Sequence, residues 1–322
     1  MKLGVFNPLF GHMEFEEMLD YVKESGLEAV EIGTGGYPGN KHCDVDTLLE
    51  SQEARDEYLK EFQSRGLIIS AFSCHGNPLT PDKDFAAESD EALRKSIKLA
   101  SLMNVPVVNA FSGTPAGNDT DTSVNWPVTP WPEEYSEIKN WQWEHKLIPY
   151  WKEIGELAKE HDVKIGLELH GGFLVHTPHT MLELRKATNE YIGANLDPSH
   201  MWWQGIDPVV AIKILGKENA IHHFHAKDTY IDPENLNMYG YLDMNPYGDI
   251  QNRTWTFRSV GLGHSIEDWS KMMSALRTYG YDHVVSIEHE DGLMSVEEGF
   301  MTAVNNLQGV IIKEKPVDMW WA

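Results

Sequence analysis

The stretch Gly166-Leu167-Glu168-Leu169-His170 is an apolar run that ends in a carboxylate and an imidazole, and three later stretches have the same character. They read Asn195-Leu196-Asp197-Pro198-Ser199-His200, His222-His223-Phe224-His225-Ala226-Lys227-Asp228 and Ser286-Ile287-Glu288-His289-Glu290-Asp291. Each apolar run is typical of a buried strand, so each polar group is expected where its strand leaves the sheet. Side chains on four strands converge only if those strands lie side by side, which favours an enzyme over a binding module.

Strand-like and helix-like segments alternate from one end of the chain to the other. The expected strands are residues 2–7, 28–33, 67–74, 105–111, 163–169, 192–197, 220–227 and 283–289, and the expected helices are residues 14–25, 45–65, 84–103, 145–161, 178–188, 207–216, 266–279 and 295–312. Eight strand–helix units in series predict a (β/α)₈ barrel instead of an open doubly wound sheet. We expect residues 1–322 to form this single domain.

Several helices carry start or stop signals. Gly26 and Gly66 follow the first two, where a left-handed residue commonly ends a helix. Asp207-Pro208 predicts an N-cap followed by proline at the first helical position. The stretches Ser265-Ile266-Glu267-Asp268 and Ser295-Val296-Glu297-Glu298 have the spacing of capping boxes.

The chain of 322 residues is longer than the ~250 residues typical of such a barrel. The excess falls in two loops, residues 113–143 and 229–264, which follow the fourth and seventh strands. Both are therefore expected at the carboxyl-terminal face, where barrels of this kind place their active sites.

Composition excludes several classes of function. The chain has 26 Lys and Arg against 50 Asp and Glu, a net charge of -24, so it lacks the basic surface that nucleic-acid binding requires. Cys43 and Cys74 do not make a disulfide framework, which fits a reducing compartment. Neither a secretory signal nor a membrane-spanning stretch is recognisable, and we expect a cytoplasmic protein without a membrane partner.

The polar groups at the four strand ends suit a metal. Glu168, Asp197, His225 and Glu288 offer three carboxylates and one imidazole, ligands that favour Mn²⁺, Mg²⁺, Co²⁺ or Fe²⁺ over a thiolate zinc site. We expect one divalent ion, with Mn²⁺ preferred. His223 faces the same side of its strand as His225 but lies one layer deeper, so His225 is the expected ligand.

His200 follows Asp197 by three residues and allows two interpretations. It can be a further ligand, or it can contact substrate or support the ligands from behind. We favour the second, because four ligands already leave few open positions on the ion.

At these residues the chain resembles the sugar phosphate isomerase/epimerase superfamily, the xylose-isomerase-like barrels. The resemblance also covers three further segments: Glu31-Ile32-Gly33-Thr34-Gly35-Gly36-Tyr37-Pro38-Gly39, Ser73-Cys74-His75-Gly76-Asn77-Pro78 and Arg258-Ser259-Val260-Gly261-Leu262-Gly263-His264. The superfamily also contains a three-zinc DNA-repair nuclease, but Trp255-Thr256-Phe257 lacks the additional ligands that this branch would need.

The resemblance implies roles for individual residues. Glu168, Asp197, His225 and Glu288 would bind the metal, and in the keto-sugar epimerase branch Glu168 and Glu288 would also form the acid–base pair. The chemistry would be removal of a proton beside a carbonyl, with the metal stabilising the enediolate. His75, Lys227 and Arg258 are expected to contact the substrate, and in an isomerase Lys227 or Arg258 would hold a phosphate.

His145 suggests a more specific reaction. It is expected at a helix N-terminus, where the macrodipole favours a neutral imidazole and so a candidate base. In this respect the chain resembles the catalytic alpha subunit of bacterial C-glycoside deglycosidases. The resemblance implies a carbon–carbon lyase that acts on 3-oxo-C-glucosides, with His145 as base and a loop that stacks on the aglycone through Trp126, Trp131, Trp141 and Trp143.

That branch implies a smaller second subunit, for which Met319-Trp320-Trp321 is a candidate anchor. A homo-oligomer is the other expectation. Two alternatives to the lyase remain. One is a keto-sugar epimerase or aldose–ketose isomerase, and the other is a sugar-binding barrel without catalytic activity, which would be expected to have damaged ligands.

Overall fold

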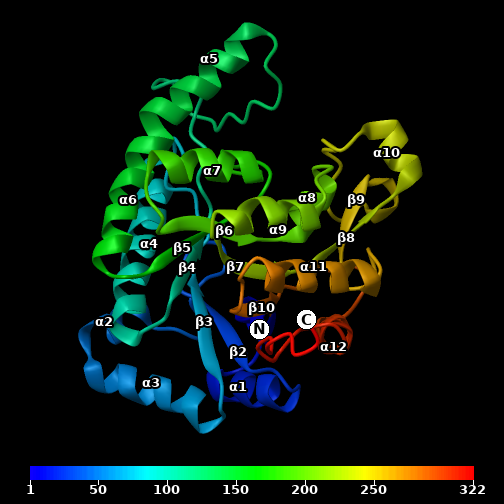
Figure 1. Cartoon of the computed structure of the whole chain (residues 1–322). Coiled ribbons are helices and arrows are strands. Elements are labelled where there is room, and N and C mark those ends of the chain that lie inside the picture. Colours follow the sequence, from blue (N-terminus) through cyan, green and yellow to red (C-terminus); the bar gives the residue numbers. More distant parts are fainter.

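A closed barrel of eight parallel strands forms the centre of the protein in the computed structural model, which describes residues 1–322 (Figure 1). The strands are β1 (Lys2–Phe6), β2 (Ala29–Gly33), β3 (Ile68–Ser73), β4 (Val107–Ala110), β5 (Lys164–Glu168), β6 (Ile192–Leu196), β7 (Ile221–Ala226) and β10 (Val284–Ile287). Their order around the barrel is β1-β10-β7-β6-β5-β4-β3-β2. The predicted (β/α)₈ barrel is confirmed, and all eight strands lie within the expected ranges.

Helices connect the strands. They are α1 (Phe15–Glu24), α2 (Val45–Glu50), α3 (Gln52–Ser64), α4 (Lys83–Met103), α5 (Glu133–Gln142), α6 (Ile148–Glu160), α7 (Pro178–Ala187), α8 (Pro198–Trp203), α9 (Pro208–Lys217), α10 (Pro233–Tyr239), α11 (Ile266–Thr278) and α12 (Val296–Gln308), with 3₁₀ turns η1 (Asn7–Phe10) and η3 (Ile250–Asn252) and a π-helical turn η2 (Trp143–Leu147). Most of them are packed around the barrel, while α5 and α10 lie in loops that extend from it (Figure 1). No helix combines the length and apolarity that a membrane crossing requires.

The hydrophobic core lies between strands and helices. Trp151 of α6 and Trp269 of α11 are fully buried, and the indole of Trp151 donates a 2.8 Å hydrogen bond to the carbonyl of Ser112. Burying one large apolar side chain stabilises the fold by about 1.5–3 kcal/mol. These helices are therefore held on the barrel by their apolar faces more than by helix propensity.

Two expected helices have different bounds. The segment expected at 45–65 is broken at Ser51, which ends α2 and caps α3 by accepting a hydrogen bond from the backbone N–H of Ala54. The segment expected at 145–161 begins earlier, because α5, η2 and α6 follow one another without a gap. His145 thus lies inside a continuous helical segment, and the prediction that it stands at a helix N-terminus is wrong.

Most of the predicted helix signals are confirmed. Gly26 and Gly66 have φ of 80° and 65°, the left-handed conformation expected after α1 and α3. Asp207 caps α9, with Pro208 at its first position, and Ser265 and Asp268 form a reciprocal capping box on α11. Ser295 caps α12 by accepting a hydrogen bond from the backbone N–H of Glu298. The Glu298 side chain does not bond to the backbone N–H of Ser295, so this second capping box is only half formed.

The loop between β7 and α11 has structure of its own. β8 (Asp228–Ile231) pairs antiparallel with β9 (Trp255–Arg258), and α10 lies between them in sequence. Asp228 anchors this loop, because its carboxylate accepts hydrogen bonds from the backbone N–H groups of Gly261, Gly263 and His264. The segment from Arg258 to His264, one of those that carry the family resemblance, therefore contains a turn held by the buried carboxylate of Asp228.

Candidate metal centre

Four ligand-type side chains meet at the carboxyl ends of neighbouring strands. Glu168 is the last residue of β5, Asp197 follows β6, His225 lies in β7 and Glu288 follows β10. One ligand atom from each lies within 4.8 Å of the others. Asp197 and His225 are fully buried, and only the side chain of Glu288 keeps appreciable exposure, at 16%. The structure thus brings together the four residues that the sequence singles out.

Several buried atoms in this cluster lack hydrogen-bond partners. They are Asp197 Oδ2, His225 Nδ1, Glu288 Oε2, His75 Nε2 and His200 Nε2. His225 Nδ1 lies 2.9 Å from Glu288 Oε2 and 3.6 Å from Glu168 Oε2, without the alignment of a hydrogen bond. His75 Nε2 and His200 Nε2 lie against Glu168, at 2.9 and 3.0 Å, whereas Asp197 Oδ2, Glu288 Oε2 and His225 Nδ1 converge on one point and fit a divalent metal, since buried polar atoms are normally paired.

A lysine ammonium lies among these carboxylates. Lys227 Nζ is 3.2 Å from Asp197 Oδ2, 3.0 Å from Glu288 Oε2 and 3.0 Å from Glu290 Oε2, and it packs over the ring of Phe257. Lys227 is only 2% exposed. One positive charge balances only part of this acidic group, which leaves a strong local field for a divalent cation.

The carboxylates differ in their ionisation. Burial raises the pKa of Asp197 to about 7, although Lys227 opposes this effect. For Glu288, burial is outweighed by Lys227 and His225, which lower its pKa to about 2. Burial also acts to raise the pKa of Glu168, but contacts with His200 and His75 hold it well below its usual range.

His200 supports the carboxylates from behind. The indole N–H of Trp203 donates a 3.0 Å hydrogen bond to His200 Nδ1, so a neutral His200 carries its proton on Nε2. That Nε2 lies 3.0 Å from Glu168 Oε1 and 3.4 Å from Asp197 Oδ2. A protonated nitrogen cannot bind a metal, so this geometry favours the supporting role over ligation.

Glu31 lies on the other side of His225, deeper in the barrel, and its role is not apparent from the sequence. Both of its carboxylate oxygens are 3.0 Å from His225 Nε2. Ser73, Asn109 and Ser286 also donate hydrogen bonds to it. An ionised carboxylate only accepts hydrogen bonds, so it keeps the imidazole proton on Nε2 and leaves Nδ1 free towards the ligand cluster.

Burial alone would lower the pKa of His225, but Glu31 and Glu288 raise it well above its usual value. Without a metal His225 is therefore protonated on both nitrogens, and an ion at this site would displace the proton on Nδ1. The side-chain amide of Asn195 also lies 3.1 Å from His225 Nε2. Because Nε2 carries a proton, the end of the amide that faces it must be the oxygen, which accepts the hydrogen bond. His223 is buried beside them, with Nδ1 3.3 Å from the other end of the Asn195 amide. The deeper position expected for His223 agrees with this arrangement.

Replacing Glu31 with Gln is expected to weaken metal binding about 10–100-fold, the usual effect of losing the partner of a ligating histidine. The amide can donate to His225 Nε2 and so place the imidazole proton on Nδ1, where it blocks the metal. Titration with Co²⁺, followed by its absorption spectrum, measures both affinity and ligand geometry. Glu28→Gln, at the surface just before β2, is the control, and an affinity equal to that of the wild type in Glu31→Gln would contradict this role.

A cavity of about 230 Å³ lies over the cluster. Its walls include His75, Glu168, Lys227 and Glu288, together with His170, whose role is not apparent from the sequence. His170 is half-buried, its ring centroid lies 4.0 Å from that of His200, and burial lowers its pKa. This volume is below the ~300–1,000 Å³ of drug-sized ligand sites, so it suits a compound about the size of one sugar.

Two expected site residues lie elsewhere. His145 is exposed on η2 and packs against Trp141 at a ring-centroid distance of 6.3 Å. Arg258 binds Asp291, with 2.9 Å between Nε and Oδ2. Neither lines the cavity over the cluster, whereas His75 and Lys227 do.

Comparison with known proteins agrees with the barrel. The family model described as a xylose isomerase-like TIM barrel matches residues 19–308. The uncharacterised protein YfiH of Bacillus subtilis is 37% identical over 314 residues, which is 97% of this chain and 99% of that protein. The 3-dehydroshikimate dehydratase of Bacillus anthracis is 23% identical, over 89% of this chain and 90% of the enzyme.

Among solved structures, a D-tagatose 3-epimerase-like protein superposes with a TM-score of 0.62. It is 21% identical, with coverage of 96% of this chain and 98% of that one. At this identity the likeness concerns the fold.

Proposed function

Because the chain belongs to the xylose isomerase-like TIM barrel family, we propose that it is a divalent-metal-dependent isomerase or epimerase that acts on a sugar or a related polyhydroxy compound. The observation that carries this proposal is the convergence of Glu168, Asp197, His225 and Glu288 within 4.8 Å at the floor of a small cavity. A divalent ion held there would polarise a substrate carbonyl and stabilise the enediolate formed by proton loss.

The proposed proton transfer needs two groups, one for each face of the substrate carbon. Glu168 and Glu288 come from strands that are separated in the barrel by β6 and β7, so they approach the cavity from different sides. One carboxylate would remove the proton, and the other would return a proton to the opposite face after taking one up from solvent, because the lowered pKa values of Glu168 and Glu288 leave both ionised at rest. The side chain of Glu288 is 16% exposed against 4% for Glu168, which favours Glu288 as the group that reaches the substrate first.

The remaining cavity residues would orient the substrate. Lys227 offers an ammonium beside the carboxylates, and His75 and His170 offer imidazoles on the wall. Phe6, Tyr37 and Phe111 surround them with aromatic surface that limits water. Such a site binds hydroxyl and carbonyl oxygens at one end and the carbon skeleton at the other.

A second candidate is an elimination, in which the enediolate expels a leaving group instead of taking up a proton. The relationship to a dehydratase supports this candidate. The carbon–carbon lyase that acts on 3-oxo-C-glucosides is its most specific form. The small volume of the metal cavity and the absence of His145 from its lining favour the isomerase or epimerase over that lyase. Mn²⁺ as the ion, and a second subunit, remain predictions.

Hydrogen exchange tests the shared step and separates the candidates. The metal-loaded protein is incubated in D₂O with ketoses and, separately, with a 3-oxo-C-glucoside, and ¹H NMR follows the proton beside the carbonyl. Exchange with formation of an epimer or aldose is expected for the proposed function, whereas release of the aglycone identifies the lyase. Exchange that persists unchanged after removal of the metal with EDTA would contradict metal-dependent enolisation.

A further inference from the structure

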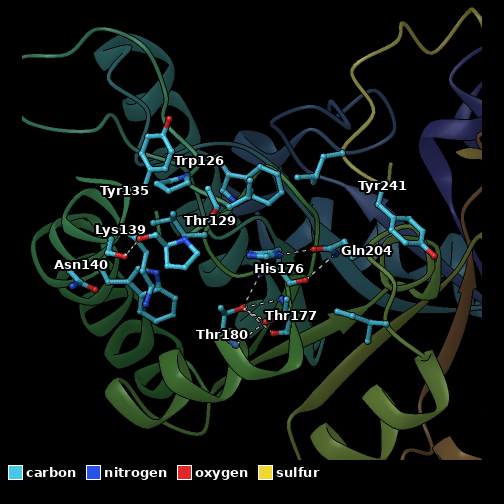
Figure 2. Close-up of a pocket in the computed structure, with 18 of the residues that line it drawn as sticks. Trp126, Thr129, Tyr135, Lys139, Asn140, His176, Thr177, Thr180, Gln204 and Tyr241 are labelled. Atoms are coloured by element: carbon cyan, nitrogen blue, oxygen red, sulfur yellow. Dashed lines mark hydrogen bonds between the residues drawn. The ribbon is translucent and has the colours of Figure 1, made fainter. Parts of the chain in front are cut away.

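A second cavity, of about 610 Å³, lies near the metal centre and shares no lining residue with it (Figure 2). The loop after β4 and helix α5 form one wall of this cavity. The start of α7 and the end of α8 form its floor, and the loop after α10 closes the far side. Its volume lies within the ~300–1,000 Å³ of small-molecule sites. Two of the indoles for which the C-glycoside deglycosidase resemblance implies stacking on an aglycone, Trp126 and Trp143, line this cavity, but the proposed isomerase or epimerase reaction does not use it.

The walls favour a planar ring. Three indoles, those of Trp126, Trp143 and Trp203, and the phenols of Tyr135 and Tyr241 line the cavity. Figure 2 shows Trp126 and Tyr135 on one side of the cavity and Tyr241 on the other. Aromatic faces and edges prefer flat partners at stacking or edge-to-face distances. A flat ring therefore fits between these walls better than a flexible aliphatic chain.

The charge of the lining favours a neutral or anionic ligand. None of the 19 lining residues is Asp or Glu, although the chain contains 50 of them among 322 residues. Lys139 is in the wall, where its ammonium lies 5.7 Å from the centre of the Trp143 ring and forms no ion pair within the protein. A free cation in a lining without carboxylates attracts an acidic group and disfavours an amine.

The floor presents a hydrogen-bond acceptor. The amide nitrogen of Gln204 donates to the backbone carbonyls of His176 and His200, at 3.1 and 2.8 Å, which turns its oxygen towards His176 Nδ1 at 2.6 Å. His176 Nδ1 must then carry the proton, and burial keeps the ring neutral by lowering its pKa. Its Nε2 makes no hydrogen bond within the protein and can accept one from a ligand hydroxyl.

We propose that this cavity is a second ligand site, for a hydroxylated aromatic acid. The ring lies between the indole and phenol walls, the hydroxyl donates to His176, and the acidic group lies towards Lys139. The proposal does not depend on metal-dependent enolisation, because no residue of the metal centre contributes to this cavity.

Isothermal titration with 4-hydroxycinnamate as the probe tests it, with 4-hydroxyphenethylamine as a matched phenol that carries a positive charge. We expect saturable 1:1 binding of the acid and at least tenfold weaker binding of the amine. Trp126→Ala is expected to weaken the acid about tenfold. Trp131→Ala, in the same loop but 78% exposed and outside the lining, is the control and should bind as the wild type does.

A second variant separates charge from stacking without touching the core. Lys139→Gln should weaken 4-hydroxycinnamate severalfold and leave its methyl ester unaffected. The proposal is overturned by absence of binding, by equal binding of acid and amine, or by full binding in Trp126→Ala. Titrations repeated with EDTA and in Glu288→Gln should give the same affinity, and loss of binding there would place the probe at the metal centre and overturn the proposal.

Discussion

Glu288→Gln is expected to lose divalent-metal binding by more than 100-fold and to lower turnover by about 10²–10⁴-fold, the range for removal of a general acid–base group. The substitution preserves size but replaces a carboxylate oxygen that lies 2.9 Å from His225 Nδ1, in the cluster where four ligand atoms meet. Metal content after dialysis, measured by mass spectrometry, and the hydrogen-exchange rate in D₂O are the two readouts.

Glu290→Gln is the matched control for metal binding. Glu290 is two residues further on and also contacts Lys227 at 3.0 Å, but its side chain is 50% exposed and lies outside the four-residue cluster. It should keep one metal per chain. Retention of a full equivalent of tightly bound metal by Glu288→Gln would show that this carboxylate is not a ligand.

Lys227→Met is expected to destabilise the metal-free protein by about 3–5 kcal/mol, the usual cost of removing one partner from a buried group of charges. The substitution leaves Asp197 and Glu288 without the ammonium that lies within 3.2 Å of both. The metal-binding equilibrium should move in the opposite direction, because the ion no longer competes with a fixed positive charge. Urea unfolding in EDTA, and again with Mn²⁺, measures both effects.

The metal should therefore restore much of the stability that Lys227→Met loses. Lys271→Met is the control, since Lys271 also contacts two carboxylates, those of Glu267 and Asp268, but is solvent-exposed and should change stability little. Equal stability of Lys227→Met and the wild type in EDTA would mean that the carboxylates around Lys227 are protonated or hydrated in the metal-free state.

The barrel strands and the four-residue cluster could be predicted because both depend on local pattern. Buried parallel strands read as short apolar runs, and a polar residue that ends such a run must emerge at the carboxyl edge. Glu168, Asp197, His225 and Glu288 satisfy this rule, and the closed barrel makes their strands neighbours. Their function as ligands remains a prediction that the metal titrations test.

The helix expected to begin at His145 shows where local pattern fails. Pro132 precedes the real start of the helical segment at Glu133, and the π-helical turn at Trp143–Leu147 continues it into α6. No residue near His145 marks this continuity. The pairing of β8 with β9 is likewise not predictable from local pattern, because residues 232–254 separate the two strands and no tight turn joins them.

The chain by itself determined the order of strands and helices, the residues that end each strand, and the acidic character of the surface. Only the tertiary structure decided that Glu31 supports His225 from below, that Lys227 lies among three carboxylates, and that the loops after β4 and α10 enclose an aromatic cavity without acidic residues. The physical reason is range. Hydrophobic periodicity and helix capping act over a few neighbouring residues, whereas a site is made by side chains that the closed barrel brings together from 194 positions apart, as with Glu31 and His225.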